Sequence, residues 1–258
     1  MSQTTERGKA WIATSTGLVL EGRSCGAAGT ASGELCFNTS MTGYQEIMTH
    51  PGAAGQVLVF TMPEIGVYGV NANDETTPGV KATAVIARAI TEKPSNWASE
   101  GSLPEYLEAH NVVAIDRVDT RLLTKHIRDH GSVTAIVTTE EAPADDLIAK
   151  AKAVEATEAM TEAEAKAKEL GAVVARLPIG HHASNIPVKN IQTGELHITS
   201  QHHNYDFDFD GVEGVEVTYL NMNDATVEGF RVIATGEEFT FFAPLELRPL
   251  NPATLGSE

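Results

Sequence analysis

The chain has 258 residues and a mass of 27.5 kDa, with 42% hydrophobic and 21% charged residues, which is typical of a folded globular protein and long enough for two modest domains. Thirty-five acidic residues against 18 basic ones give a formal net charge of −17, which repels phosphate backbones and anionic lipid, so nucleic acid is not expected as a partner. No apolar run reaches the roughly 18 residues that a membrane helix needs, so a soluble protein with no membrane partner is expected.

The first half of the chain consists of short apolar runs separated by glycine, asparagine and proline, a pattern that predicts strands joined by tight turns. Examples are residues 17–22, 56–60 and 84–90. Two helices are predicted between the strands: residues 103–109, preceded by the capping residue Ser102, and residues 120–130, closed by Gly131. An α+β domain is therefore predicted for residues 1–142.

The segment 143–170 is rich in alanine, glutamate and lysine. Asp145 and Asp146 fall in its first turn and Gly171 follows its last turn, which favours helix throughout. Its apolar positions form only a thin stripe, so this helical connector is expected to pack on one side at most.

From residue 171 onward the pattern again predicts strands, at residues 188–191, 195–199, 215–219, 230–233 and 239–242. No helix long enough to cross over between parallel strands lies among them. A small antiparallel or mixed sheet is therefore predicted.

Two parts of the sequence resemble a known family. Residues 33–51 read Gly-Glu-Leu-Cys-Phe-Asn-Thr-Ser-Met-Thr-Gly-Tyr-Gln-Glu-Ile-Met-Thr-His-Pro, which is similar to the signature of the N-terminal domain of the carbamoyl-phosphate synthetase small subunit. Further matches follow in family order at Thr61, Pro63, Ile65-Gly66, Gly69, Asn71, Asp74-Glu75, Ser95-Asn96-Trp97, Asp119-Thr120-Arg121, Leu123-Thr124 and Arg128. The C-terminal part resembles the family's glutamine amidotransferase domain at Gly180-His181, Asn185, Pro187-Val188-Lys189, Ile198-Thr199-Ser200-Gln201, Asn223-Asp224 and Val227-Glu228-Gly229.

The resemblance implies an architecture and a partner. It implies a β/β/α-type small-subunit domain at residues 1–142, a helical connector at 143–170 and, at 171–258, the remnant of an α/β amidotransferase domain without its nucleophile-bearing core. In this family the small subunit releases ammonia from glutamine, and the large subunit uses that ammonia to make carbamoyl phosphate for pyrimidine and arginine biosynthesis. The implied partner is the large subunit, the implied location is the cytoplasm, and no cofactor is expected.

The catalytic parts of the amidotransferase are missing from the sequence. A class I amidotransferase needs a cysteine on a sharp G-x-C-x-G turn, where backbone amides stabilise the oxyanion, and no such turn exists here. The family's closing Gln-Tyr-His-Pro-Glu aligns with residues 242–246, so Pro244 replaces the general base and Glu246 is only a vestigial triad candidate. The family's glutamine-binding turn aligns with residues 202–205, and only Ser40 remains at the position of a glutamine contact.

These losses predict a small-subunit-like protein that does not hydrolyse glutamine and acts as a scaffold or regulatory subunit, so no catalytic residue is assigned. Two alternatives stay open at this point. The chain could be a stand-alone metal- or protein-binding module, or a non-functional deletion product whose remnant domain exposes apolar faces.

The two cysteines are interpreted as structural. Cys36 lies in a strand-like run and is expected in the core, whereas Cys25, close to Gly22 and Gly26, is expected to be more exposed but not activated. Two cysteines are too few for a secreted disulfide framework, which agrees with a reduced compartment.

The histidine pairs His181-His182 and His202-His203 suggest a metal site, because imidazole is a common metal ligand. Adjacent residues on a strand point to opposite faces, so each pair can give only one ligand to a given site. Solvated or packed histidines are the favoured interpretation, no metal site is predicted, and the role of the pairs stays open.

Three further features have structural interpretations. The three aspartates at 206, 208 and 210 alternate with phenylalanine, which is typical of an amphipathic strand rather than of a calcium loop. The glycines at 43, 66 and 69 fit tight turns, since no P-loop lysine follows them. Asp119 is expected to cap a helix, with Arg121 able to reach back to it, and by resemblance this motif lies in the domain that contacts the large subunit.

Overall fold

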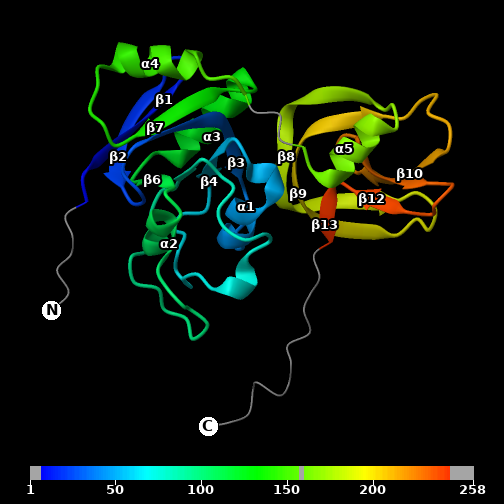
Figure 1. The fold of residues 1–258 in the computed structure, drawn as a ribbon, viewed down its shortest axis with the longest axis horizontal. Helices are drawn as coiled ribbons and strands as arrows, with labels where there is room; N and C mark the ends of the chain where they lie inside the picture. Colours follow the sequence, from blue (N-terminus) through cyan, green and yellow to red (C-terminus); the bar gives the residue numbers. More distant parts are fainter. Residues whose placement is uncertain (1–6, 157–159, 245–258) are drawn as a thin grey trace, which may run out of the picture.

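Two β-sheets organise the chain and lie side by side along its long axis (Figure 1). The computed structural model describes residues 7–156 and 160–244. The first sheet closes into a barrel with the strand order β1-β2-β6-β5-β4-β3-β7, and the second has six strands in the order β12-β11-β10-β8-β9-β13. With helices added to both, the structure confirms the predicted α+β class.

The first half of the chain builds the barrel and its covering helices. Its strands are β1 (Lys9–Thr14), β2 (Val19–Ser24), β3 (Thr30–Asn38), β4 (Gln56–Phe60), β5 (Ala84–Ile86), β6 (Val113–Asp116) and β7 (Thr134–Thr138). Its helical segments are α1 (Tyr44–Thr49), the 3-10 helices η1 (Pro51–Ala53) and η2 (Ala72–Asp74), α2 (Leu103–Ala109), α3 (Thr120–His130) and α4 (Ala144–Lys152). The strands β3, β4, β5 and β6 run parallel to their neighbours within this group, and the remaining pairs are antiparallel.

Both predicted helices of this half are confirmed, and their caps explain their starts. The Ser102 hydroxyl and the Glu105 carboxylate form a capping box at the start of α2. The Asp119 carboxylate accepts a hydrogen bond from the backbone N–H of Leu122 and opens α3, while Gly131, at φ 76°, ends it. The predicted strand at 84–90 is shorter than expected and ends at Ile86.

The central strand β4 is buried on both faces, as parallel strands covered on both sides are. Leu58 and Phe60 belong to the hydrophobic cluster that includes residues of α1 and α2. Val57 and Val59 belong to the cluster that includes Leu123 of α3. Successive side chains of β4 therefore point alternately into the two hydrophobic clusters on its two faces.

The second half of the chain forms the other sheet. Its strands are β8 (Val173–Asn190), β9 (Leu196–Asp208), β10 (Val215–Asn221), β11 (Val227–Val232), β12 (Glu238–Thr240) and β13 (Phe242–Pro244). Every pairing found between these strands is antiparallel, which fits the sequence prediction. The strand β8 starts at Val173 rather than at the predicted 188, because residues 173–176 and 181–183 also pair with β9, on either side of a register shift that includes Pro178 and Gly180.

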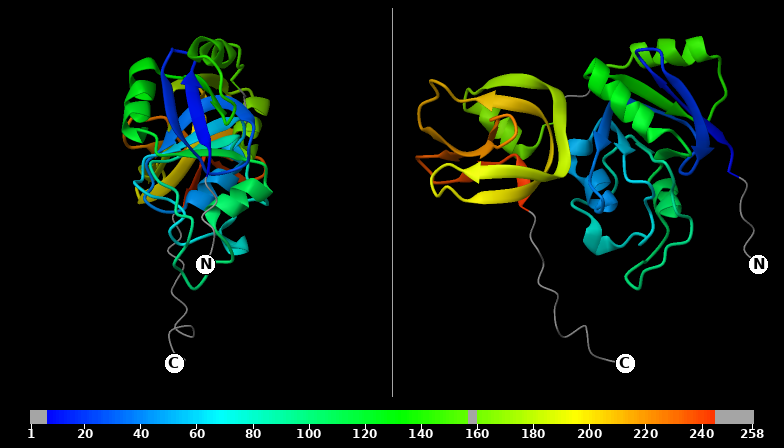
Figure 2. Two further views of the ribbon diagram at one scale, coloured as in Figure 1. Left: turned by 90° about the vertical axis from the view of Figure 1, so that its left-hand side faces the viewer. Right: turned by 180° about the vertical axis from the view of Figure 1, so that it is seen from behind.

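An aromatic core holds the second sheet. Phe207, Phe230 and Phe241 are at most 6% exposed and belong to one cluster. Phe207 lies between Asp206 and Asp208 on β9, so the amphipathic strand predicted there is confirmed. Figure 2 shows the strands of this sheet curving around the core together with α5 (Glu162–Glu169).

The connector contains two helices, a number that the sequence alone left open; residues 153–156 and 160–161 are not helical, so the expectation of helix throughout residues 143–170 is wrong. The helix α4 ends at Lys152 and buries Leu147 and Ala151 against the barrel. The helix α5 starts at the capping box of Thr161 and Glu164 and buries Ala163 and Ala167 in the aromatic cluster of the second sheet. The apolar residues of α4 therefore pack on the barrel and those of α5 pack on the second sheet. The Thr161 cap marks where the second of these helices begins.

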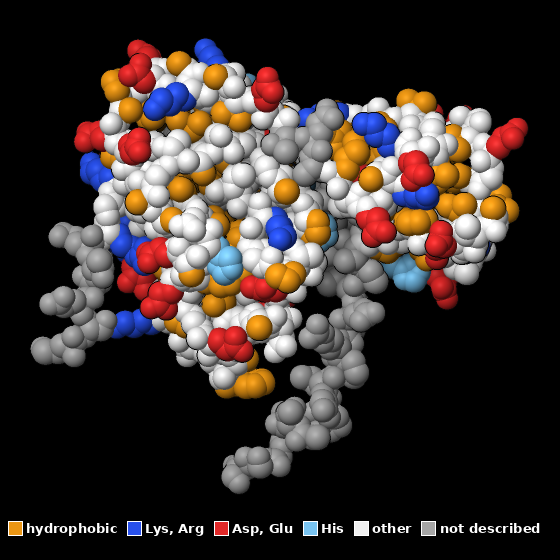
Figure 3. Space-filling view, viewed as in Figure 1, with side chains coloured by type: hydrophobic (Ala, Val, Ile, Leu, Met, Phe, Trp, Pro, Cys, Tyr) orange, Lys and Arg blue, Asp and Glu red, His pale blue; other side chains and the backbone are white. Residues whose placement is uncertain are grey.

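The two sheets meet along β3, η1, β8 and β9. Glu34 of β3 forms an ion pair with Arg176 of β8, and the rings of His50 and His202 lie 5.2 Å apart between centroids. Acidic side chains are spread over both sheets on the face shown in Figure 3 rather than gathered in one patch. Within the described residues, no helix is both long and apolar enough to cross a membrane.

Candidate functional site

Both cysteines are buried in the core of the barrel. Cys36 is 5% exposed in the barrel core, as predicted, but Cys25 is 0% exposed, so the prediction of a more exposed Cys25 is wrong. The neighbouring glycines mark close packing, not exposure: a Cβ on Gly26 would lie 2.3 Å from the backbone oxygen of Val112. Burial, followed by the charge of Asp116, raises the pKa of the Cys25 thiol to about 12, and burial raises the pKa of Cys36 well above its usual value.

This burial predicts thiols that are inert in the folded chain. With a pKa of about 12 against a usual 9.0, Cys25 has roughly a thousandfold less thiolate at neutral pH than a free thiol. In a titration with an aromatic disulfide reagent, we expect both thiols to react at least about a hundredfold more slowly in the native chain than in denaturant. A thiol that titrates at the rate of free cysteine in the native protein would contradict this account.

Pro244 is the residue that the sequence aligns with the amidotransferase base. Pro244 ends β13 and pairs with Thr199 of β9. Glu246 lies outside the described residues. The stretch aligned with the glutamine-binding turn is not a turn: His202 and His203 lie in the middle of β9, opposite His182 and His181 of β8. Pairing with β8 keeps these residues extended.

Ser40 already has a partner within the chain. Its Oγ lies 2.5 Å from the Ser184 Oγ, which in turn lies 3.1 Å from the Ser200 Oγ. Three hydroxyl groups thus connect the barrel to β8 and β9, and Ser40 is 7% exposed. Its role as a glutamine contact stays a prediction.

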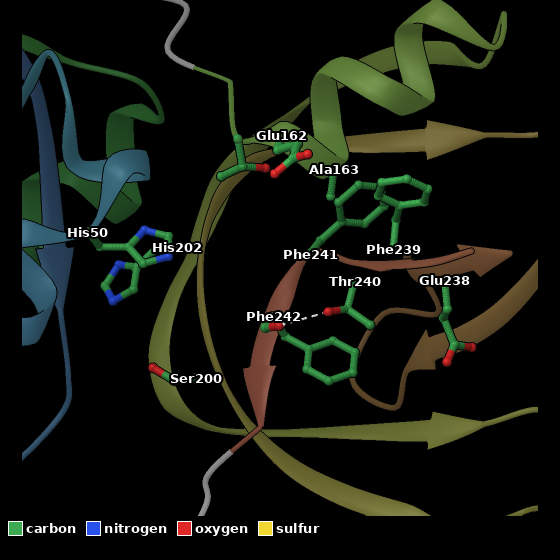
Figure 4. Close-up of a pocket in the computed structure, with 11 residues that line it drawn as sticks. His50, Glu162, Ala163, Ser200, His202, Glu238, Phe239, Thr240, Phe241 and Phe242 are labelled. Carbon is green, nitrogen blue, oxygen red and sulfur yellow. Dashed lines mark hydrogen bonds between the residues drawn. The ribbon is translucent and has the colours of Figure 1, made fainter. Parts of the chain in front are cut away.

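A pocket of about 420 Å³ opens where the barrel meets the second sheet, beside the start of α5 (Figure 4). His50 from the barrel and His202 from β9 lie next to each other in it, with Ser200 further along the same strand. Burial lowers the pKa of both histidines, most strongly that of His202, so both rings are neutral. The pocket thus brings two neutral imidazoles close to the hydroxyl-bearing Ser200.

A second histidine cluster lies within the second sheet. His181 and His203 share one side of the β8–β9 pair, with ring centroids 4.8 Å apart, and Glu228 of β11 lies against both. His182 and His202 contact each other separately, as expected for neighbours that point to opposite faces. Burial alone would raise the pKa of Glu228, but the adjacent His181 and His203 lower it to about 2, so its carboxylate is ionised. Sequence reasoning named both histidines and missed Glu228, which joins them only through the folding of β11.

A groove of about 850 Å³ runs beside α3. Its wall includes Asp119, Arg121 and Lys125 of the helix, and the guanidinium of Arg128 lies 5.8 Å from the ring centre of Phe37. The Asp119 cap is confirmed, but within the described part of the chain Arg121 makes no hydrogen bond or ion pair, so it does not reach back to Asp119. The basic side chains of the helix are therefore available to a partner.

Both a family model and individual known proteins are similar to this chain. Residues 12–137 match the model of the carbamoyl-phosphate synthase small chain, CPSase domain. The carbamoyl phosphate synthase small chain of Aquifex aeolicus is 30% identical over 335 residues, covering 87% of this chain and 90% of the relative. The protein of the same name from Nitratidesulfovibrio vulgaris (strain Miyazaki F) is 29% identical, covering 86% and 89%, and that of Synechococcus is 43% identical over 155 residues, covering 60% and 40%. The chain belongs to the carbamoyl phosphate synthase small chain family.

Proposed function

We propose that this chain is a carbamoyl phosphate synthase small chain that does not hydrolyse glutamine and acts as a scaffold or regulatory partner of a large chain. The observation that carries the proposal is the burial of both thiols in the barrel, Cys25 at 0% and Cys36 at 5% exposure. Acyl transfer from glutamine needs an exposed, activated nucleophile next to a base. Neither thiol meets that requirement.

The comparisons support the loss of a whole segment. The alignment with the Aquifex aeolicus relative runs over 335 residues, more than the 258 of this chain, so the relative has residues without a counterpart here. The described second sheet is antiparallel throughout its pairings, and an antiparallel hairpin, β8–β9, occupies the region after the connector. These observations agree with an amidotransferase domain reduced to the strands that follow its nucleophile.

The second sheet is packed, which favours a maintained protein over a decayed remnant. Phe207 and Phe230 are 0% exposed. Some apolar surface does remain, because Leu196 and Ile198 are 64% and 54% exposed at the end of the β8–β9 hairpin. The packed core is the feature that a non-functional deletion product is least expected to keep.

The groove beside α3 is the surface that we assign to the large chain. We expect the large chain to retain this protein in a pull-down, and the charge reversal Arg121→Glu to weaken binding by about tenfold, or about 1.4 kcal/mol. The matched control is Lys189→Glu, which reverses an equally exposed cation on the second sheet and should leave binding unchanged. Absence of binding by the unmodified chain would remove the family role, and equal weakening by both variants would remove the assigned surface.

A further inference from the structure

The side chains of His181, His203 and Glu228 lie close together, in positions from which all three could bind one metal ion. The residues come from three strands, β8, β9 and β11, and meet because the long β8–β9 pair curves over the sheet (Figure 1). Their side chains are 13%, 1% and 0% exposed. Ligands that come from rigid strands and lie out of bulk water are held in place before an ion arrives.

The donor atoms of the three residues lie within 4.8 Å of one another. His181 Nδ1 lies 3.3 Å from His203 Nε2 and 3.3 Å from Glu228 Oε1, while His203 Nε2 lies 3.3 Å from the other carboxylate oxygen, Glu228 Oε2. In a tetrahedral zinc site, metal–ligand distances of about 2.0–2.1 Å separate the ligand atoms by about 3.3 Å. Each contact between two of the three residues already has this spacing, so an ion between the side chains would meet all three residues with little movement.

The outer hydrogen bonds of both rings fix which nitrogen faces inward without a proton. His203 Nδ1 lies 2.9 Å from the carbonyl oxygen of Tyr205, which can only accept, so Nδ1 carries the hydrogen. His181 Nε2 lies 2.8 Å from Asp224 Oδ2 and donates to that carboxylate. Partners of this kind orient and polarise metal-binding histidines in known sites.

In the neutral tautomers that these hydrogen bonds select, the inward nitrogens of both rings are acceptors that face the Glu228 carboxylate. Glu228 Oε2 is buried and makes no hydrogen bond within the described residues, although His203 Nε2 is 3.3 Å away. Asn221 Nδ2 donates to Glu228 Oε1 at 2.9 Å and holds the carboxylate in place. Asn221 Nδ2 also lies 3.4 Å from His181 Nδ1, at the long end of hydrogen-bond distance. Three electron-pair donors thus converge, and a cation would satisfy all of them at once.

We propose that this chain binds one divalent transition-metal ion of the zinc class through His181 Nδ1, His203 Nε2 and Glu228. Two imidazoles and one carboxylate are ligands that zinc accepts, with water in the remaining position. Entry is from the side of Asp224, whose side chain is 41% exposed. The site is distinct from the pocket of His50 and His202, and it does not depend on glutamine chemistry or on a large chain.

The test uses the full chain freed of metal by chelator dialysis. We expect isothermal titration with Zn²⁺ to give one ion per chain, and Co²⁺ to give the visible absorption of a tetrahedral site. His203→Ala and Glu228→Gln should each weaken binding by more than about 100-fold, and Asp224→Asn, which changes only an outer partner, by about tenfold. His197→Ala is the matched control, because His197 lies on the same strand outside the cluster and should bind as the unmodified chain does.

Two results would overturn the proposal. One is the absence of stoichiometric binding to the unmodified chain, which would mean that a protonated histidine, and not a metal, compensates Glu228. The other is unchanged affinity in Asp224→Asn together with His181→Gln, both of which alter partly exposed side chains and do not depend on tolerance of a substitution in the core.

Discussion

The substitution Phe230→Ala is expected to lower the free energy of unfolding of the second sheet by about 3–5 kcal/mol. Phe230 is 0% exposed, and its ring lies 4.9 Å from that of Phe209 and 5.2 Å from that of Phe239 between centroids. Truncation removes this aromatic contact and leaves a cavity that neighbouring strands cannot fill. Because the core of the barrel shares no member with this cluster, the loss should fall on the second sheet.

Chemical denaturation followed by two probes measures this effect. Trp11 and Trp97 both lie in the barrel half, so tryptophan fluorescence follows the barrel, while circular dichroism follows both sheets. We expect an early dichroism transition in Phe230→Ala with a smaller change in fluorescence. The control is Ile233→Ala, next to the end of β11 and 63% exposed, which should stay within about 0.5 kcal/mol of the unmodified chain. A Phe230→Ala chain as stable as this control would contradict the packed second core.

Local signals in the sequence predicted the helices and the class of the fold. The capping residues Ser102 and Asp119 and the closing Gly131 act within one turn of the chain, so the sequence alone locates α2 and α3. The start of β8 could not be predicted in this way, since residues 173–176 become a strand only by pairing with β9, beyond the irregular stretch around Pro178. The start of α5, by contrast, has a local signal in the capping box of Thr161 and Glu164, which sequence reasoning did not use.

At the candidate sites, too, the sequence predicts features that depend on neighbouring residues and not those that depend on contacts between distant residues. The missing G-x-C-x-G turn is visible in the sequence because it is a local motif. The burial of Cys25 is not visible there, because its neighbour Gly26 can mean either an open turn or a close backbone contact, and only the position of β6 decides between them. The contact of Glu228 with His181 and His203 depends on the curvature of two strands and the register of a third.

The largest expected effect concerns the nitrogen source. In a triad hydrolase, removal of the nucleophile or the base costs about a millionfold in rate, and this chain has no activated thiol and has Pro244 at the position aligned with the base. A complex with the large chain is therefore expected to use free ammonia and to gain nothing from glutamine. The stabilising and docking surfaces of the small chain do not depend on the missing residues, so activity with ammonia should persist.

The measurement that tests this account most directly is carbamoyl phosphate formation by the purified complex, supplied first with glutamine and then with an ammonium salt. A family member that carries the G-x-C-x-G turn, bound to the same large chain, serves as the positive control. We predict product at the background rate with glutamine and full activity with ammonium. Glutamine-dependent product that a thiol-alkylating reagent abolishes would contradict the proposed loss of glutaminase chemistry.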